Sequence, residues 1–368
     1  MLPQSQDLVQ IIFPAKVQGK VLDDFLEEGW FRNCSSMYRS KIICLDAEIS
    51  SIVNIRLPLE GYRYPKRLAK LFRKHQERFR VKICKMQIDD TKDALYKAHG
   101  NRFKGYVFES LKDYMHDVEE QSRVFDTLEV AVYDGKELVA FSFFDIGHRS
   151  IATILGVYRQ DYKHYSLGIF TMLLEIEHAI EAGKAYYYPG YVFHQPSVFD
   201  YKLRLGDFEY FNWKQWQPYS KRIHERWLSE ELYHAHAILK KALDMADIRY
   251  QEFFYVLYSM GYMVSSMYQC FRELYFLELY DYPMQLPADS LCVAAYLPTE
   301  RRFALYELTL HPFSFLMELP DTKLHHPEKH FTEPLCYRNT LFETDNALDL
   351  VLFLKGGNPS PFIPKDVL

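Results

Sequence analysis

Cysteines are few in this sequence, and no two of them are spaced for metal binding. There are six in 368 residues, with no C-x-x-C pair, which argues against a zinc site and against a disulfide framework. The histidine pairs, such as His234 with His236 and His325 with His326, lack the spacing or the carboxylate neighbours of a metal site. We therefore expect no metal ion. The cysteines are Cys34, Cys44, Cys84, Cys270, Cys292 and Cys336.

Long apolar runs and a basic net charge are also missing. No run approaches the length needed to cross a bilayer, and no charged-then-apolar leader opens the chain. We therefore expect a cytoplasmic protein without a membrane partner. The formal net charge of −5 argues against wholesale coating of nucleic acid, and we expect no DNA partner.

Aromatic residues are plentiful instead. The chain has 29 Tyr and 27 Phe, and aromatic content reaches 16%, which suits either tightly packed cores or base stacking. The length suits two or three domains, each with its own core. We expect an N-terminal region over residues 1–122, a central module over 123–222, and a helical bridge and extension over 223–368.

One predicted strand–helix–strand unit organises the chain. Between Ser166 and Gly183 apolar residues recur at helical spacing, with Ser166 at the expected N-cap and Gly183 where a helix can end. Residues 152–158 and 185–188 are the predicted strands. Free backbone N–H groups at the helix start, around Gly168, favour a negative charge or a developing oxyanion. The apolar stripe consists of Ile169, Met172, Leu173, Ile176 and Ile180.

A predicted meander precedes this helix. Residues 128–133 and 138–144 form a hairpin around Asp134-Gly135, and residues 151–158 add a third strand. Meander, helix and strand in this order resemble the GNAT acyltransferases, so we expect an α/β (α+β) fold with a GNAT-like module. GNAT enzymes that use acetyl-CoA have a glycine-rich turn at the helix start, whereas residues 159–168 contain a single glycine. This counts against CoA.

The most basic part of the chain lies between residues 63 and 85. Ten Lys or Arg residues stand there against one acid, Glu77. Leu68, Leu71 and Phe72 mark the inner face of an amphipathic helix. Its outer face is either simply solvated or a phosphate-binding surface whose affinity falls with salt. The outer residues are Lys66, Lys70, Arg73 and Lys74.

Other elements follow from local patterns. We expect helices over 22–29, over much of 86–122, over 227–246 and over 250–258. We expect strands over 51–59, 302–310 and 348–354.

Several motifs follow one another through the first two thirds of the chain. They are Gly29-Trp30-Phe31-Arg32, Ile55-Arg56-Leu57-Pro58, Leu138-Val139-Ala140 to Asp145-Ile146, Gly156-Val157-Tyr158, Ser166-Leu167-Gly168-Ile169-Phe170, Glu175-Ile176-Glu177, the tyrosine-rich strand with Gly190-Tyr191, and Tyr201-Lys202. In order and spacing they resemble the aminoacyl-tRNA–protein transferases, which comprise the arginyltransferases of the N-end rule pathway and their bacterial leucyltransferase relatives. The resemblance covers about residues 10–215.

The resemblance implies a reaction. The free α-amine of a protein's N-terminal residue attacks the ester that joins an amino acid, with arginine favoured over leucine, to the 3′ end of tRNA. The partners are then an aminoacyl-tRNA donor and an acceptor protein N-terminus. Because the ester is already activated, the enzyme works largely by positioning and needs no cofactor. A proton acceptor and donors for the oxyanion are still required.

The resemblance also implies site residues. Asp145 matches a family aspartate that would orient or deprotonate the amine, although a turn carboxylate at a strand end is the alternative. Tyr187 and Tyr191 would face an open crevice beside Gly190, which permits close approach, unless they pack in the core. Lys202, in the family's Tyr-Lys, would hold an acidic N-terminal residue or a tRNA phosphate, unless it is a surface lysine.

The remaining assignments complete the expected site. Ser166, Gly168, Gly190, Tyr201 and Lys202 would bind substrate, with capping alone sufficient to explain Ser166. The basic helix with Lys66, Lys70, Arg73 and Lys74 would bind tRNA. His194 is either a base or an ordinary polar loop residue.

The sequence also departs from the family. Arg159-Gln160-Asp161 stands where the family has Asp-Pro-Asp, and residues 194–200 replace a Cys-Pro-Lys-Met-like run. Two alternatives stay open: a CoA-dependent GNAT N-acyltransferase, and a noncatalytic relative that binds tRNA or a degron.

Overall fold

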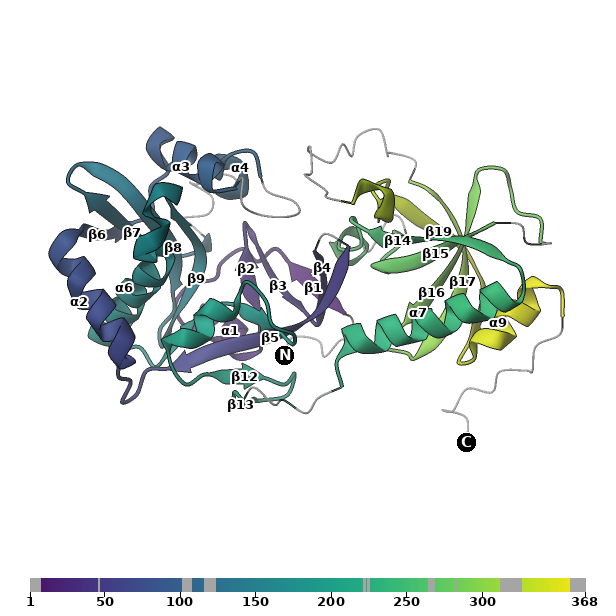
Figure 1. Ribbon diagram of the computed structural model, residues 1–368, viewed down its shortest axis with the longest axis horizontal. Helices are drawn as coiled ribbons and strands as arrows, with labels where there is room; N and C mark the ends of the chain where they lie inside the picture. The colour runs from purple at the N-terminus through teal and green to yellow at the C-terminus, as the bar shows by residue number, and fades with distance from the viewer. Residues whose placement is uncertain are drawn as a thin grey trace. The chain divides into compact units, whose positions relative to one another are not determined.

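The computed structural model forms two compact units (Figure 1). The central unit comprises residues 11–39 and 52–224, and the C-terminal unit comprises residues 1–10, 40–51 and 225–368. The structure describes residues 8–45, 47–100, 108–115, 124–220, 223, 226–263, 269–280, 282, 284–311 and 326–357. Among these residues, no helix is both long and apolar enough to cross a membrane.

The central unit is built on a mixed sheet with the strand order β13-β12-β5-β10-β9-β8-β7-β6, and β11 pairs with β5 as well. Strands β6 to β9 form an antiparallel meander, and β10 lies parallel to β9 with Tyr186 opposite Ser150. The predicted meander–helix–strand layout and the α+β class are thereby confirmed. The strands are β5 (Glu48–Pro58), β6 (Arg80–Lys85), β7 (Thr127–Asp134), β8 (Glu137–Ile146), β9 (Ser150–Tyr158), β10 (Tyr186–Tyr188), β11 (Tyr191–Phe193), β12 (Glu209–Phe211) and β13 (Trp216–Pro218).

The predicted hairpin is present, but its turn lies one residue later than expected. Asp134 pairs with Glu137, so the two turn residues are Gly135 and Lys136. Gly135 has a φ of 62°, a conformation that glycine adopts without the steric cost of a side chain.

Helices cover both faces of this sheet. Helix α6 packs on β7, β8, β9 and β10, α2 packs on α6, and α3 packs on β8 and β9 (Figure 1). Side chains of β8 alternate accordingly, because successive residues of a strand point to opposite faces. Phe141 and Phe143 join the cluster around α3 and α4, whereas Ser142 contacts Glu175 of α6. The helices are α1 (Lys20–Glu27), α2 (Lys66–Arg78), α3 (Asp90–Gly100), α4 (Leu111–Met115) and α6 (Leu167–Glu181).

The ends of α6 differ in how well they match the prediction. Gly183, at a φ of 65°, follows the helix end as expected. Ser166 instead has a left-handed conformation, with φ 54° and ψ 44°, and its side chain makes no capping hydrogen bond. The expectation of a serine N-cap is therefore wrong. A 3-10 helix, η1 (Gln160–Tyr165), leads directly into α6 and determines how the chain enters it.

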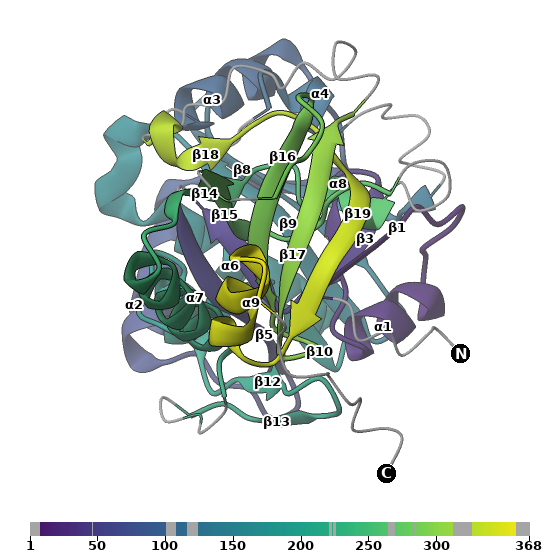
Figure 2. The same cartoon turned by 90° about the vertical axis from the view of Figure 1, so that its right-hand side faces the viewer.

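The C-terminal unit contains a six-stranded sheet in the order β18-β14-β15-β16-β17-β19. Helix α7 (Leu228–Met245) packs on β14 and β16, α9 (Ala347–Leu354) packs on β17 and β19, and the two helices contact each other. Figure 2 shows both helices across this sheet. The strands are β14 (Arg249–Tyr255), β15 (Tyr275–Tyr280), β16 (Ser290–Leu297), β17 (Arg302–Leu310), β18 (His330–Phe331) and β19 (Leu335–Thr344). The remaining elements of the chain are β1 (Val9–Ile12), β2 (Phe31–Asn33), β3 (Ser36–Ser40), β4 (Ile42–Leu45), α8 (Met260–Met263), η2 (Asp200–Leu205) and η4 (Pro327–Lys329).

For two segments of this unit the predicted secondary structure is wrong. Residues 250–258 were expected to be helical, yet Arg249–Tyr255 is a strand that pairs with β15 along its length. Residues 348–354 were expected to be a strand, yet they belong to α9. Asn346 accepts a hydrogen bond from the Leu348 N–H and caps this helix, which buries residues at helical spacing, Ala347, Leu350, Val351 and Leu354.

The helix predicted within residues 86–122 is divided between α3 and α4. Residues 101–107 and 116–122 of that prediction lie outside the described residues.

Candidate functional site

A narrow cavity lies beside Gly190, where β10 leads into β11. Its volume is about 10 Å³, and its lining includes Arg32, Asp145, Thr153 and Gly190. A cavity of this size holds one water molecule. These residues therefore enclose a narrow cavity, and not the open crevice that was expected beside the tyrosine-rich strand.

Asp145, at the end of β8, is fully buried in an ion pair. Its carboxylate accepts hydrogen bonds from Arg32 Nη1 at 2.7 Å and from Thr127 Oγ1 at 2.6 Å. The Arg32 guanidinium also lies 3.8 Å above the Phe125 ring centroid. Burial raises the pKa of Asp145, and the charge of Arg32 opposes that rise. The carboxylate thus has a cation as its partner at the wall of the cavity.

Tyr187 does not face solvent, contrary to the expected position. The residue is fully buried, and its hydroxyl donates a hydrogen bond to Glu175 of α6 at 2.8 Å. Thr153 Oγ1 lies 2.7 Å from the same hydroxyl and also donates to Glu175. Thr153, Tyr187 and Glu175 thus form a buried hydrogen-bonded group on the α6 face of the sheet, whereas their neighbours Ala152 and Tyr188 line the cavity from the other face.

Glu175, which begins the motif Glu175-Ile176-Glu177, is a buried acid on the inner face of α6. Its carboxylate also accepts a hydrogen bond from Ser142 Oγ at 2.5 Å, and the residue is fully buried. Burial raises its pKa to about 7, and the three hydroxyl donors limit that rise. The signal for it was present, since Glu175 occupies the apolar stripe between Met172 and Ala179 at helical spacing.

Lys202 lies next to Gly190. Its ammonium donates a hydrogen bond to the Tyr191 carbonyl at 3.0 Å, and a Cβ atom added at Gly190 would lie 3.5 Å from Nζ. The ammonium is 5.4 Å from the ring centroid of Tyr191 and 5.1 Å from that of Phe199. Burial in these apolar surroundings lowers the pKa of Lys202 to about 8. Lys202 is thus a half-buried cation rather than a fully solvated surface lysine.

Aromatic side chains surround this lysine. Tyr191 and Phe193 stack with ring centroids 5.9 Å apart and planes 16° apart, and Phe199 packs on both. All three are half-buried, and Tyr201 beside them is 41% exposed. His194 is half-buried. We call Tyr191, Phe193, Phe199 and Lys202 the aromatic–lysine cluster.

Ser166 and Gly168 lie away from this cluster. A Cβ atom added at Gly168 would lie 3.5 Å from the Tyr158 ring, at the end of β9. Gly190 follows Tyr188, which pairs with Ala152 near the start of β9. Six residues of strand separate Ala152 from Tyr158, about 20 Å. The structure therefore brings Asp145 and Gly190 to one cavity with Lys202 beside it, and places the start of α6 elsewhere.

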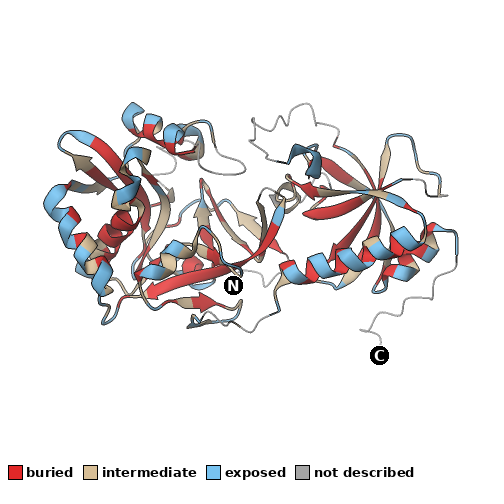
Figure 3. Ribbon diagram, viewed as in Figure 1, coloured by how far each residue is buried: buried red, intermediate tan, exposed pale blue. Residues whose placement is uncertain are grey.

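The outer face of α2 carries the predicted cationic stripe. One side of the helix is exposed and the other is buried (Figure 3). Lys66, Lys70, Arg73 and Lys74 are exposed, whereas Leu68, Phe72 and His75 are buried. The helix has no acid in its first turn, where the helix dipole favours a negative charge. This distribution leaves the start of the helix available to anions. Whether tRNA binds there stays a prediction.

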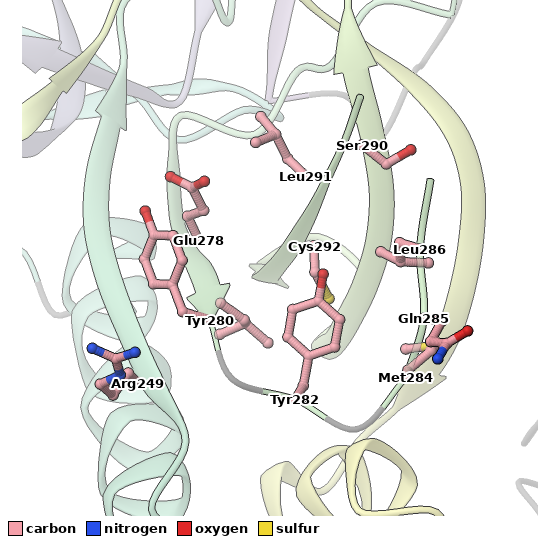
Figure 4. A pocket seen from close by; sticks show the side chains of 11 residues that line it. Arg249, Glu278, Tyr280, Tyr282, Met284, Gln285, Leu286, Ser290, Leu291 and Cys292 are labelled. Atoms are coloured by element: carbon pink, nitrogen blue, oxygen red, sulfur yellow. The ribbon is translucent and has the colours of Figure 1, made fainter. Parts of the chain in front are cut away.

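A larger cavity, of about 810 Å³, belongs wholly to the C-terminal unit. Figure 4 shows side chains of Arg249, Glu278 and Tyr280 on one side and of Ser290 and Cys292 on the other. None of these residues belongs to the motifs of residues 10–215.

Comparison with known proteins places residues 68–212 in a match to the family model described as "Arginine-tRNA-protein transferase, C terminus". An aspartate/glutamate leucyltransferase from Leptospira interrogans serogroup Icterohaemorrhagiae serovar copenhageni is 28% identical over 200 residues, 52% of this chain and 74% of the relative. The aspartate/glutamate leucyltransferase of Helicobacter hepaticus is 25% identical over 190 residues, 50% of this chain and 76% of the relative.

The solved structures that align with this chain are less similar to it. L-PGS from Bacillus licheniformis aligns at a TM-score of 0.33 and 11% identity over 46% of this chain and 60% of that chain. A GCN5-related N-acetyltransferase from Kribbella flavida aligns at a TM-score of 0.26 and 12% identity over 48% of this chain and 55% of that chain. This chain therefore spans less than two thirds of either structure.

Proposed function

We propose that this chain, which is similar to the aminoacyl-tRNA–protein transferases over residues 68–212, transfers an amino acid from aminoacyl-tRNA to the N-terminal α-amine of an acceptor protein. One observation carries the proposal. The stretch that matches the family model, residues 68–212, contains most of α2, the meander, all of α6, Gly190 and Lys202. We place the reaction in the cytoplasm, where charged tRNAs are kept.

Arginine is our first candidate for the transferred amino acid. The description of the matching family model, which names arginine-tRNA, supports it. Leucine is the second candidate, because the relatives from Leptospira and Helicobacter are both named leucyltransferases.

The acceptor in this proposal begins with Asp or Glu. Both relatives are named for these residues, and the half-buried ammonium of Lys202 suits a carboxylate. A cation in apolar surroundings gains more from an opposite charge than one in water does. Gly190, next to Nζ, lets a backbone approach without meeting a side chain.

The tRNA end in this proposal lies outside the narrow cavity. A space that holds one water molecule accommodates an amine nitrogen but not an adenosine. The aromatic–lysine cluster offers ring faces on which a terminal adenine can stack, and stacking of this kind contributes about 1–3 kcal/mol per base.

Once the two substrates are positioned, the chemical step requires only that protons be moved between them. The amine nitrogen attacks the ester carbonyl carbon, an amide bond forms, and the bond to the ribose oxygen breaks. One proton leaves the nitrogen and one joins the departing oxygen, so no proton is consumed. Asp145 can accept the first proton, because it lines the cavity and its Oδ2 atom has no hydrogen-bond partner among the described residues. Its other oxygen holds Arg32 at the cavity wall.

Transfer assays test the proposal directly. Arginyl-tRNA and leucyl-tRNA, each labelled on the amino acid, are incubated separately with the protein and peptides that begin with Asp, Glu or Lys. We expect label on the Asp and Glu peptides, with arginyl-tRNA as the better donor. Label from leucyl-tRNA alone would assign the second donor. Tight tRNA binding without transfer from either would favour a noncatalytic relative, and label from acetyl-CoA would favour the CoA-dependent alternative.

Variants test the proton path within the same assay. Asp145→Asn should lower kcat about 100-fold or more, in the range that general base catalysis contributes, with little change in tRNA affinity. Glu181→Gln, which changes an exposed carboxylate of the same unit, is the control and should keep full activity. Circular dichroism verifies that both variants are folded, and equal rates in the two folded variants would remove Asp145 from the mechanism.

A further inference from the structure

Three buried side chains of the C-terminal unit converge although they are far apart in the sequence. The sulfur atoms of Cys270 and Cys336 and a ring nitrogen of His311 all lie within 4.8 Å of one another. Exposure is 8% for Cys270, 6% for Cys336 and 3% for His311. We call these residues the Cys–His triad.

Strand pairing explains why the two cysteines meet. Cys270 and Cys336 form an antiparallel bridge, flanked by hydrogen bonds from Phe271 N to Leu335 O and from Tyr337 N to Gln269 O, each 2.8 Å long. The cysteines thus occupy a non-hydrogen-bonded pair, in which side chains approach most closely.

The histidine joins them from the other side of β19. Thr309 of β17 pairs with Cys336, and the His311 backbone N–H donates to Pro334 O. Residues 309 and 311 lie on one face because side chains alternate along a strand. His311 is therefore the diagonal neighbour of Cys336, within reach of a long side chain.

We propose that Cys270, Cys336 and His311 bind one divalent metal ion of the zinc type, with a water molecule as the fourth ligand. Two thiolates and an imidazole form a set that Zn²⁺ prefers. Two sulfur ligands of a tetrahedral zinc ion lie about 3.8 Å apart. The three ligand atoms here lie within 4.8 Å of one another, so a small movement of the side chains would bring them to bonding distance of an ion. On binding, both S–H bonds break and two protons leave for solvent, which makes the site electrically neutral. A neutral site tolerates burial far better than isolated thiolates do.

The metal in this proposal holds the unit together rather than performing transfer. It joins the end of β17, the start of β19 and the segment at Cys270, which come from different parts of the chain. The inference does not depend on the proposed transferase function.

Cobalt provides the probe. The full-length protein, kept reduced and stripped of metal with a chelator, is titrated with Co²⁺. We expect thiolate-to-cobalt charge-transfer absorption and the intense visible bands of tetrahedral cobalt, both saturating at one ion per chain and both abolished by Zn²⁺. Zn²⁺ should also raise the midpoint of thermal unfolding, because an ion that binds only the folded state stabilises it.

Variants identify the ligands. Cys270→Ser, Cys336→Ser and His311→Gln should each weaken Co²⁺ binding at least 100-fold, more than loss of an outer-sphere partner does. Cys292→Ser is the matched control, since Cys292 is a buried cysteine of the same sheet. It should bind like the original chain. Circular dichroism verifies folding, and His311→Gln, which leaves both cysteines in place, serves if a serine variant unfolds.

Three results would overturn the proposal. The first is the absence of thiolate-to-cobalt absorption, and the second is its persistence in the Cys270→Ser and Cys336→Ser variants. The third is a Cys270–Cys336 disulfide found in freshly purified, alkylated protein, since two cysteines joined to each other cannot supply two thiolate ligands.

Discussion

The hydroxyl of Tyr187 donates a hydrogen bond of 2.8 Å to the carboxylate of Glu175, which joins β10 to α6 inside the central unit. Thr153 donates a further hydrogen bond to the same carboxylate. An acid buried in this way makes the stability of the fold depend on pH.

The first prediction concerns the pH dependence of stability. The pKa of Glu175 is raised from 4.5 to about 7 in the folded state, so folding favours its protonated form. Its contribution to stability is complete below pH 4.5 and is lost as the pH rises through about 7, with a loss of roughly 3 kcal/mol. We expect Glu175→Gln to flatten this part of the profile, as measured by urea unfolding at pH 5 and pH 8. An unchanged difference between the two pH values, equal to that of Glu181→Gln, would contradict the prediction.

The second prediction concerns the buried ion pair of Arg32 and Asp145. Removal of one partner leaves an uncompensated buried charge, so Arg32→Ala should cost about 3–5 kcal/mol. The double variant with Arg32→Ala and Asp145→Asn should be more stable than Arg32→Ala alone. A double-mutant cycle by chemical denaturation measures the coupling, and simple additivity of the single effects would show that the pair contributes nothing as a pair.

The third prediction concerns α2. Alanine at Lys70, Arg73 and Lys74 removes three exposed cations and should weaken tRNA binding. The slope of log affinity against log salt concentration should fall in magnitude by about 2 to 3, because fewer counterions are released. Filter binding over a salt series measures both effects.

A matched variant controls for net charge in this experiment. Alanine at Lys20, Lys136 and Lys241 removes three exposed lysines that lie outside α2. Equal losses in the two triple variants would mean that overall charge, and not the stripe on α2, governs binding.

The fourth prediction concerns Lys202 and acceptor choice. Because burial lowers its pKa to about 8, the ammonium is charged below that pH and neutral above it. Peptides that begin with Asp should therefore show a KM that rises above about pH 8, while donor affinity stays constant. Lys202→Met should raise that KM at pH 7 and remove its pH dependence. Equal KM values for the variant and the original chain at both pH values would exclude this lysine from acceptor binding.

Local patterns were sufficient to predict the central layout. The hairpin of β7 and β8 follows from a glycine turn, and α6 and α7 follow from long apolar stripes. Local patterns failed where the surrounding structure determined the conformation. Ser166 had the right residue type for an N-cap, yet the preceding 3-10 helix placed it in a left-handed conformation.

Short apolar segments were misread because their type depends on partners. Residues 250–255 became a strand because β15 and β18 supply hydrogen bonds on both sides. The helix type of α9 depended on a cap, Asn346, that the apolar pattern alone did not indicate. In both cases the chemistry of the segment allowed either structure.

The sequence predicted only part of the candidate sites, because some of their contacts form only in the folded chain. Motifs indicated Asp145, Gly190 and Lys202, which the structure places around or beside one cavity. The hydrogen bonds of Glu175 and the meeting of Cys270 with His311 arise from tertiary contacts. No sequence spacing encodes those contacts.

Strand β5 has a consequence for synthesis of the chain. Residues 48–51 of it pair with β4, but the rest of the strand pairs with β10, β11 and β12, all of which follow Gly183 in the chain. During translation the backbone N–H and C=O groups of that part therefore lack their partners until the whole meander and α6 have left the ribosome. Such delayed pairing slows folding and exposes the strand to aggregation, so the yield of native protein should depend on chaperones that shield β5 while the ribosome completes the rest.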